Sequence, residues 1–118
     1  MNYYVISLNH TRRSDRYITL WRPDDKGYAY PTPWAGRYAR EHVLAHLSYY
    51  NSGNCTVAVP CEVLDAVAVP PAPRMIDGDA GPVVLNTRAN WQLILANTIE
   101  DPAHPARPQY KGAPRLAA

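Results

Sequence analysis

Runs of apolar residues separated by polar, proline or glycine turns predict a small sheet in the first half of the chain. The segment 3–8 is dense in β-branched and aromatic residues and ends at a polar stretch, as a buried strand does. A second strand is predicted over 17–22 and a short third strand over 28–30. The turn residues between them, which begin with a proline and end with a glycine, predict a hairpin.

Three further patterns complete the predicted elements of the core. The clearest helix is predicted from Ala39 to Tyr49, where apolar residues recur close to the helical period, and the Asn- and Gly-rich run 51–54 ends it. A fourth strand is predicted over 55–59, followed by a short helix over 61–66. The segment 67–69 is either an extension of that helix or a fifth strand.

A second, shorter helix is predicted around Trp91, with Asn86 or Thr87 as its N-cap. An isolated helix of this length is marginal in water, so we expect it to pack on the domain or on a second copy of the chain. The run 70–82 before it is rich in proline and glycine, which prevents regular structure.

These elements predict an α+β fold: a small antiparallel sheet of three to five strands, one main helix packed on one face, and a short C-terminal accessory helix. At 118 residues the chain has room for one hydrophobic core. Residues 1–70 are expected to form the core domain. Residues 71–98 are expected to form a linker and the accessory helix docking on the core, and residues 99–118 a flexible basic tail.

Charge is unevenly distributed along the chain. Between residues 10 and 40, seven Lys and Arg face three Asp, whereas between residues 51 and 101 two Arg face six acidic residues. The tail is purely basic, with Arg107, Lys111 and Arg115. Such asymmetry creates a positive surface that attracts anions, although a solvated surface with few charges has the same composition.

The first third of the chain alternates arginines with aromatic rings, and this pattern predicts a binding surface. Arginine neutralises phosphate, exposed rings stack on unpaired bases, and Tyr, Trp and Arg dominate protein interfaces. The alternative is that half of the rings are core and the arginines keep a sheet edge soluble. The candidate residues are Arg12, Arg13, Arg16, Trp21, Arg22, Tyr28, Tyr30, Trp34, Arg37 and Tyr38.

His42 and His46 are one helical turn apart and precede Cys55 and Cys61, and this His₂Cys₂ composition is one that zinc uses. Against zinc, the two cysteines are not a close pair, and two histidines at this spacing occur readily on a helix surface. Two cysteines are too few for a disulfide scaffold, so both are expected as thiols. No cofactor is predicted.

No catalytic residue is predicted, because the sequence supplies only fragments of a reaction centre, such as Ser7, His10 and Asp15 around one loop. No apolar run approaches the ~20 residues of a membrane span, and the first residues lack the features of a signal peptide. We therefore expect a cytoplasmic protein without a membrane partner.

Several segments look like small hypothetical proteins encoded by bacteriophages and prophages of proteobacteria. The resemblance covers about residues 3–95 and rests on turn glycines, strand aromatics and a helix stop, so it implies no catalytic residue. It implies an accessory protein that acts inside a bacterial host cell. The segments that carry it are Trp21-Arg22-Pro23-Asp24, Gly27-Tyr28, Ala35–Tyr38, Tyr49–Gly53, Thr56–Pro60, Val84–Thr87 and Trp91.

The favoured function is a non-enzymatic binding module for a host or phage protein, with self-association through the Trp91 helix as one form of it. A nucleic-acid-binding protein that uses the arginine and aromatic surface is the alternative, and a zinc-binding or hydrolytic protein is the second alternative.

Overall fold

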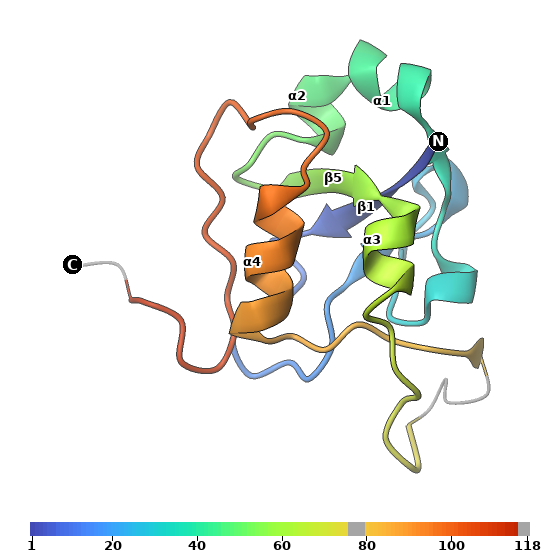
Figure 1. Ribbon diagram of the computed structural model, residues 1–118, viewed down its shortest axis with the longest axis vertical. Helices are drawn as coiled ribbons and strands as arrows, with labels where there is room; N and C mark the ends of the chain where they lie inside the picture. The colour runs from blue at the N-terminus through green and yellow to red at the C-terminus, as the bar shows by residue number, and fades with distance from the viewer. Residues whose placement is uncertain (76–79, 116–118) are drawn as a thin grey trace.

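The structure, a computed structural model, describes residues 1–75 and 80–115. Five strands form one antiparallel sheet, which confirms the predicted α+β class (Figure 1). The strands are β1 (Asn2–Ser7), β2 (Leu20–Trp21), β3 (Tyr28–Ala29), β4 (Tyr38–Ala39) and β5 (Thr56–Pro60). The helices are α1 (Arg40–Ala45), α2 (Leu47–Tyr50), α3 (Cys61–Asp65) and α4 (Arg88–Ala96), with 3₁₀ turns at Pro23–Asp25 and Thr32–Trp34.

Within the described residues, no helix combines the length and the hydropathy that crossing a membrane requires. Part of the predicted linker (76–79) and the last residues of the predicted tail (116–118) lie outside the described residues.

β1 is the central strand of the sheet and is covered on both faces. It pairs with β5 along one side and with β4 and β2 along the other. Because successive side chains of a strand point to opposite faces, Tyr4 and Ile6 enter one hydrophobic core whereas Tyr3 and Val5 enter another. The continuous apolar run at the start of the chain follows from this double burial.

β2 and β3 form the predicted hairpin. The amide of Arg22 donates a 2.8 Å hydrogen bond to the carbonyl of Gly27 across its turn. Within the turn, Asp24 and Asp25 have φ angles of 58° and 59°, in the left-handed region that Asp tolerates better than most residues. The sequence places an acidic pair where the backbone needs this conformation.

α3, α4 and the last described residues cover the first face of the sheet, in front of it in Figure 1. Trp91 and Ile94 of α4 are 1% and 0% exposed, and they contact the same core as Leu64 of α3. The predicted Trp91 helix is therefore part of the main core. Of the two predicted caps, Thr87 is the N-cap of α4, because the Thr87 hydroxyl accepts a 3.3 Å hydrogen bond from the amide of Asn90.

The second face of the sheet is covered by α1 and α2 through a smaller core that includes Tyr38, Val43 and Tyr50. The single helix predicted over 39–49 is divided at His46, whose φ and ψ of −137° and 44° are not helical. Helices therefore lie on both faces of the sheet, where the sequence predicts one main helix on one face.

The final segment lies along the domain, whereas the sequence predicts a flexible tail there. The amide of Ile99 donates to the carbonyl of Ala58 at 2.9 Å and so covers the outer edge of β5. The amide of His104 donates to the carbonyl of Ser52 at 3.1 Å. Further along, Tyr110 and Ala113 are buried in the first core.

The segment 67–69 forms neither a full fifth strand nor more helix. Val69 makes a single antiparallel bridge to Val83, with reciprocal amide-to-carbonyl hydrogen bonds of 2.9 and 2.8 Å. This bridge joins the two sides of the proline-rich segment and delivers the chain to the start of α4.

Candidate functional site

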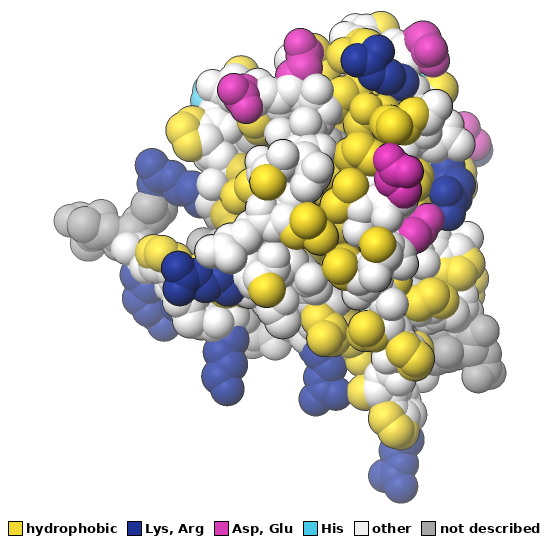
Figure 2. All heavy atoms as spheres, in the orientation of Figure 1, with side chains coloured by type: hydrophobic (Ala, Val, Ile, Leu, Met, Phe, Trp, Pro, Cys, Tyr) yellow, Lys and Arg dark blue, Asp and Glu magenta, His cyan; other side chains and the backbone are white. Residues whose placement is uncertain are grey.

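One end of the molecule gathers cationic side chains from three segments that are distant in the sequence. Figure 1 shows the loop after β1, the N-terminal end of α4 and the last described segment near one another at the lower left of the view. In Figure 2, most Lys and Arg side chains of this face lie in its lower half, whereas the Asp and Glu side chains lie in the upper half. We call this region the basic end, and it consists of Arg12, Arg13, Arg16, Arg88, Arg107, Lys111 and Arg115.

The basic end is one continuous surface, because its three shallow hollows share lining residues. The first hollow is lined by Arg16 and Lys111, the second by Arg12 and the third by Trp91. Arg13 lines both the first and the second hollow, and Arg107 lines both the second and the third. Arg88 and Arg115 line the first and the third. An extended ligand would therefore meet cations along its whole path across this end.

A buried asparagine holds the three segments together. The side-chain amide nitrogen of Asn86 lies 3.1, 3.0 and 3.0 Å from the carbonyl oxygens of Arg12, Asp15 and Gln109. Its amide oxygen accepts a 2.6 Å hydrogen bond from the indole nitrogen of Trp91. Asn86 is 7% exposed, so these bonds are shielded from water. The basic end therefore rests on a fixed backbone.

The positive charge of this end is not neutralised within the part of the chain that the structure describes. The one ion pair there, Arg37 with Asp65 at 3.0 Å, lies outside the basic end. Asp15 is the single acidic residue that lines the three hollows, and its carboxylate accepts a 2.8 Å hydrogen bond from the backbone amide of Arg12. Arg13 donates to the carbonyl of Ala113, which orients its guanidinium while leaving the charge in place.

The predicted arginine and aromatic surface is divided by the fold. Arg12, Arg13 and Arg16 belong to the basic end, whereas Trp21 and Tyr38 contribute to the second core. Tyr38 is buried, and its hydroxyl donates a 2.5 Å hydrogen bond to the carbonyl of Arg22.

The remaining predicted residues form separate small contacts. The Arg22 guanidinium lies over the Trp34 ring at 4.8 Å from its centroid. Tyr28 stacks on His10 with ring centroids 4.0 Å apart, and Tyr30 packs edge-on against Tyr17. Tyr28, Tyr30 and Trp34 line none of the three hollows of the basic end.

Arg37 belongs to a polar cluster between β1 and α3. It donates to a carboxylate oxygen of Asp65 and to the hydroxyl of Tyr4, each at 3.0 Å, while Tyr4 donates to the other Asp65 oxygen at 2.6 Å. Burial, and then the hydrogen bond to Asp65, raise the pKa of Tyr4. These bonds connect α3 to the central strand, and the charge of Arg37 is paired with that of Asp65.

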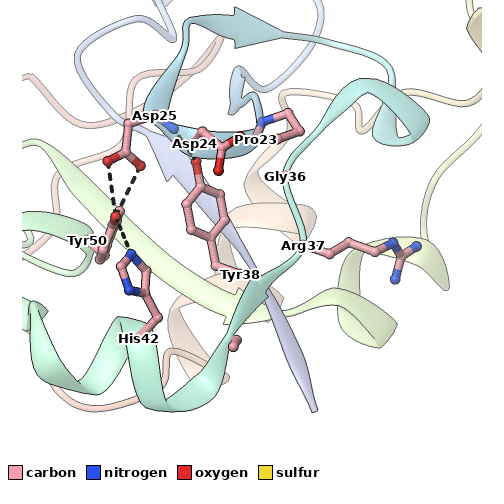
Figure 3. Close-up of a pocket in the computed structure, with 9 residues that line it drawn as sticks. Pro23, Asp24, Asp25, Gly36, Arg37, Tyr38, His42 and Tyr50 are labelled. Atoms are coloured by element: carbon pink, nitrogen blue, oxygen red, sulfur yellow. Dashed lines mark hydrogen bonds between the residues drawn. The ribbon is translucent and has the colours of Figure 1, made fainter.

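A separate hollow, outside the basic end and about 520 Å³ in volume, lies between the hairpin turn and α1 (Figure 3). There the Tyr50 hydroxyl lies 3.1 Å from each carboxylate oxygen of Asp25 and 2.8 Å from Nε2 of His42. Burial, and then the hydrogen bond to Asp25, raise the pKa of Tyr50 to about 12. The phenol therefore keeps its proton at neutral pH and connects the turn to the helix instead of acting as a base.

Figure 3 also shows the Arg37 side chain directed away from Asp25, Tyr50 and His42. The hydrogen-bonded chain in this hollow was not predicted, because its members come from the turn, α1 and α2. The break at His46 is what brings Tyr50 back to His42, and no sequence pattern indicates that break.

The four residues considered for zinc do not form a ligand set. His42 and His46 are neighbours, with ring centroids 5.2 Å apart, but Cys61 is buried at the start of α3 and Cys55 is exposed before β5. Within the described residues, no three His, Cys, Asp or Glu side chains converge as metal ligands. Burial raises the pKa of Cys61 to about 11, which keeps this thiol protonated.

The fragments considered for catalysis are local loop contacts. Nδ1 of His10 lies 2.9 Å from the hydroxyl of Ser7, which is itself 2% exposed. Asp15 bonds the backbone of its own loop and not the histidine. These side chains fix the loop that carries the first three arginines of the basic end.

Fold and surface together define the chain as a small α+β domain with one strongly basic end. Comparison with protein-family models, with curated proteins and with solved structures finds no match to this chain.

Proposed function

We propose that this protein is a non-enzymatic binding module whose basic end binds the phosphate backbone of a nucleic acid. The observation that carries the proposal is that seven cationic side chains meet around connected hollows. None of the seven takes part in the ion pair between Arg37 and Asp65. Six of them are exposed and Arg13 is half-buried, so their charges are open to a ligand. Lys and Arg that neutralise phosphates release condensed counterions, which supplies most non-specific affinity for nucleic acids.

The fixed backbone of the basic end also supports binding. Asn86 ties the loop after β1 and the final segment to α4, so the backbone segments that carry the cations are held together before a ligand arrives. Pre-organisation of this kind lowers the conformational entropy lost on binding. The resemblance to phage-encoded proteins adds the context to the proposal, namely an accessory protein inside a bacterial host cell.

A protein partner, the function favoured by the sequence, has less support from the geometry. Self-association through the Trp91 helix was one form of it, but Trp91 and Ile94 are buried inside their own chain and are not available to a second copy. An acidic protein surface would meet the same cations as a nucleic acid, and it is an outcome of the test below.

The test is a titration of labelled single-stranded and duplex oligonucleotides with the full chain, followed by fluorescence anisotropy over a range of salt concentrations. Each phosphate neutralised contributes about 0.9 to the slope of log K against log salt on duplex DNA and about 0.7 on single strands. We expect a slope corresponding to several contacts. A chain that binds no oligonucleotide at low salt, yet captures an acidic protein after nuclease treatment, would overturn the proposal in favour of the protein partner.

A further inference from the structure

The third hollow of the basic end differs from the other two because aromatic side chains line its floor. It has a volume of about 350 Å³ and lies between α4 and the final segment. Trp91 and Tyr110 line it but are only 1% and 9% exposed, so Leu95, which is 36% exposed, is its most accessible large apolar side chain. Three cations also line this hollow: Arg88 from the first turn of α4, and Arg107 and Arg115 from the final segment.

A hollow lined by both apolar side chains and cations is complementary to a ligand that carries an apolar group beside anionic groups. A nucleotide of a single strand has this form, because the faces of its base are apolar and phosphates flank it on both sides. Base-paired nucleotides keep their faces stacked inside the duplex and cannot present them. The hollow also lies in the size range of small-ligand sites, which begins at roughly 300 Å³.

We propose that this hollow takes one unpaired nucleobase of a single-stranded nucleic acid, while Arg88, Arg107 and Arg115 bind the flanking phosphates. This inference rests on the proposed function, which requires only backbone binding. Gln92, exposed on α4, also lines the hollow, and its side-chain amide supplies a donor and an acceptor of the kind that a base edge pairs with.

The path of the strand follows from the residues that the hollows share. Arg88 and Arg115 line both this hollow and the first hollow, which is also lined by Arg13, Arg16 and Lys111. A strand that places one base on Leu95 therefore continues with its phosphates along Arg16 and Lys111. The base site and the backbone path form one continuous interface.

The experiment compares three labelled probes of equal length at one salt concentration: an oligothymidine strand, a deoxyribose phosphate strand without bases, and a duplex. A base seated in the hollow removes apolar surface from water, so we expect the oligothymidine to bind about fivefold or more tightly than the strand without bases. Equal binding of these two strands overturns the base site while leaving backbone binding intact. Absence of salt-dependent binding to all three overturns the proposed function itself.

A pair of variants on one helix locates the effect. Leu95→Asn makes the floor of the hollow polar without a change of charge, and Leu93→Asn makes the same change at a position of α4 outside the hollow. We expect Leu95→Asn to remove the preference for oligothymidine while binding of the strand without bases stays unchanged. Equal loss of that preference in both variants, at matched melting temperatures, contradicts the assignment.

Discussion

The amide oxygen of Asn86 accepts a 2.6 Å hydrogen bond from the indole nitrogen of Trp91, and both residues are more than nine-tenths buried. The nitrogen of the same amide faces three backbone carbonyls from two other segments. One side chain therefore satisfies the central aromatic residue of the core and also positions the basic end.

We expect Asn86→Ala to lower the free energy of unfolding by about 3 kcal/mol or more, because it leaves the buried indole N–H of Trp91 without a partner and removes the bonds to three part-buried carbonyls. Denaturant unfolding measures the change. Asn54→Ala is the matched control, since Asn54 is exposed. A loss below about 1 kcal/mol for Asn86→Ala would show that water replaces these bonds.

The two lysines of the chain allow the basic end to be tested with two variants of equal net charge. Lys111 lies in the basic end, whereas Lys26 lies in the turn between β2 and β3. Both are exposed, so Lys111→Glu and Lys26→Glu change the total charge equally and disturb no core. We expect Lys111→Glu to weaken oligonucleotide binding about tenfold and to reduce the salt slope, while Lys26→Glu has a much smaller effect. Equal weakening by both would assign binding to net charge alone.

Two glycines separate the effect of backbone strain from that of a close contact. Gly53 has a φ of +87°, and a Cβ there would lie 1.7 Å from the carbonyl oxygen of His104. Gly112 has a similar φ of +92°, but a Cβ there would meet nothing within 4 Å. Both alanine variants carry the strain of a left-handed conformation, and Gly53→Ala alone also displaces the final segment.

We therefore expect Gly53→Ala to lower the melting temperature clearly more than Gly112→Ala, with a loss of more than about 1 kcal/mol in the free energy of unfolding. Limited proteolysis should then cut the Gly53→Ala variant near His104. If the two variants melt together, the contact between Gly53 and the final segment contributes nothing to stability.

The elements that the sequence predicts well are those fixed by local chemistry. The buried strand at the start of the chain, the hairpin around Gly27 and the Thr87 cap each depend on residues within a few positions of one another. Side-chain type and spacing are enough to determine such features. The α+β class follows from adding these local elements, whereas β4, the strand that completes the five-stranded sheet, was not predicted.

The arrangements that the sequence does not reveal depend on distant partners. Asn86 bonds the carbonyl of Arg12 across 74 positions. The sequence pattern therefore indicates Asn86 only as a possible helix cap and does not indicate that it joins distant segments. The proline-rich final segment shows no periodicity, yet Tyr110 and Ala113 complete the main core. For the same reason only three of the seven cations of the basic end were among the predicted site residues, although the basic composition of the tail was visible.

The two cysteines differ in environment, and this difference predicts their reactivity. Cys55 is exposed, whereas Cys61 is 4% exposed and burial raises its pKa to about 11. Because the thiolate is the reactive form, a thiol reagent near neutral pH should modify Cys55 quickly and Cys61 only after unfolding. Cys55→Ser should abolish the fast phase and Cys61→Ser should retain it. A fast reaction in Cys55→Ser would place Cys61 in contact with solvent.

The raised pKa of Tyr50 predicts that the protein loses stability at alkaline pH. Burial and the hydrogen bond to Asp25 raise its pKa in the folded state from 10.0 to about 12. The folded state therefore holds the phenolic proton more tightly than the unfolded chain does. Its contribution to stability is fully present below pH 10.0 and is lost as the pH rises toward 12.

We expect the free energy of unfolding of the native chain to fall between about pH 10 and about pH 12, and that of Tyr50→Phe to fall less steeply. At neutral pH, Tyr50→Phe should cost about 1 kcal/mol through the lost bonds to Asp25 and His42. Burial also raises the pKa of Tyr38 and Tyr4, so both proteins keep part of the alkaline decline. The difference between the two curves isolates Tyr50. Tyr49→Phe, at the exposed neighbouring position, should follow the native curve. If Tyr50→Phe also follows it, the phenol does not couple the turn to α2.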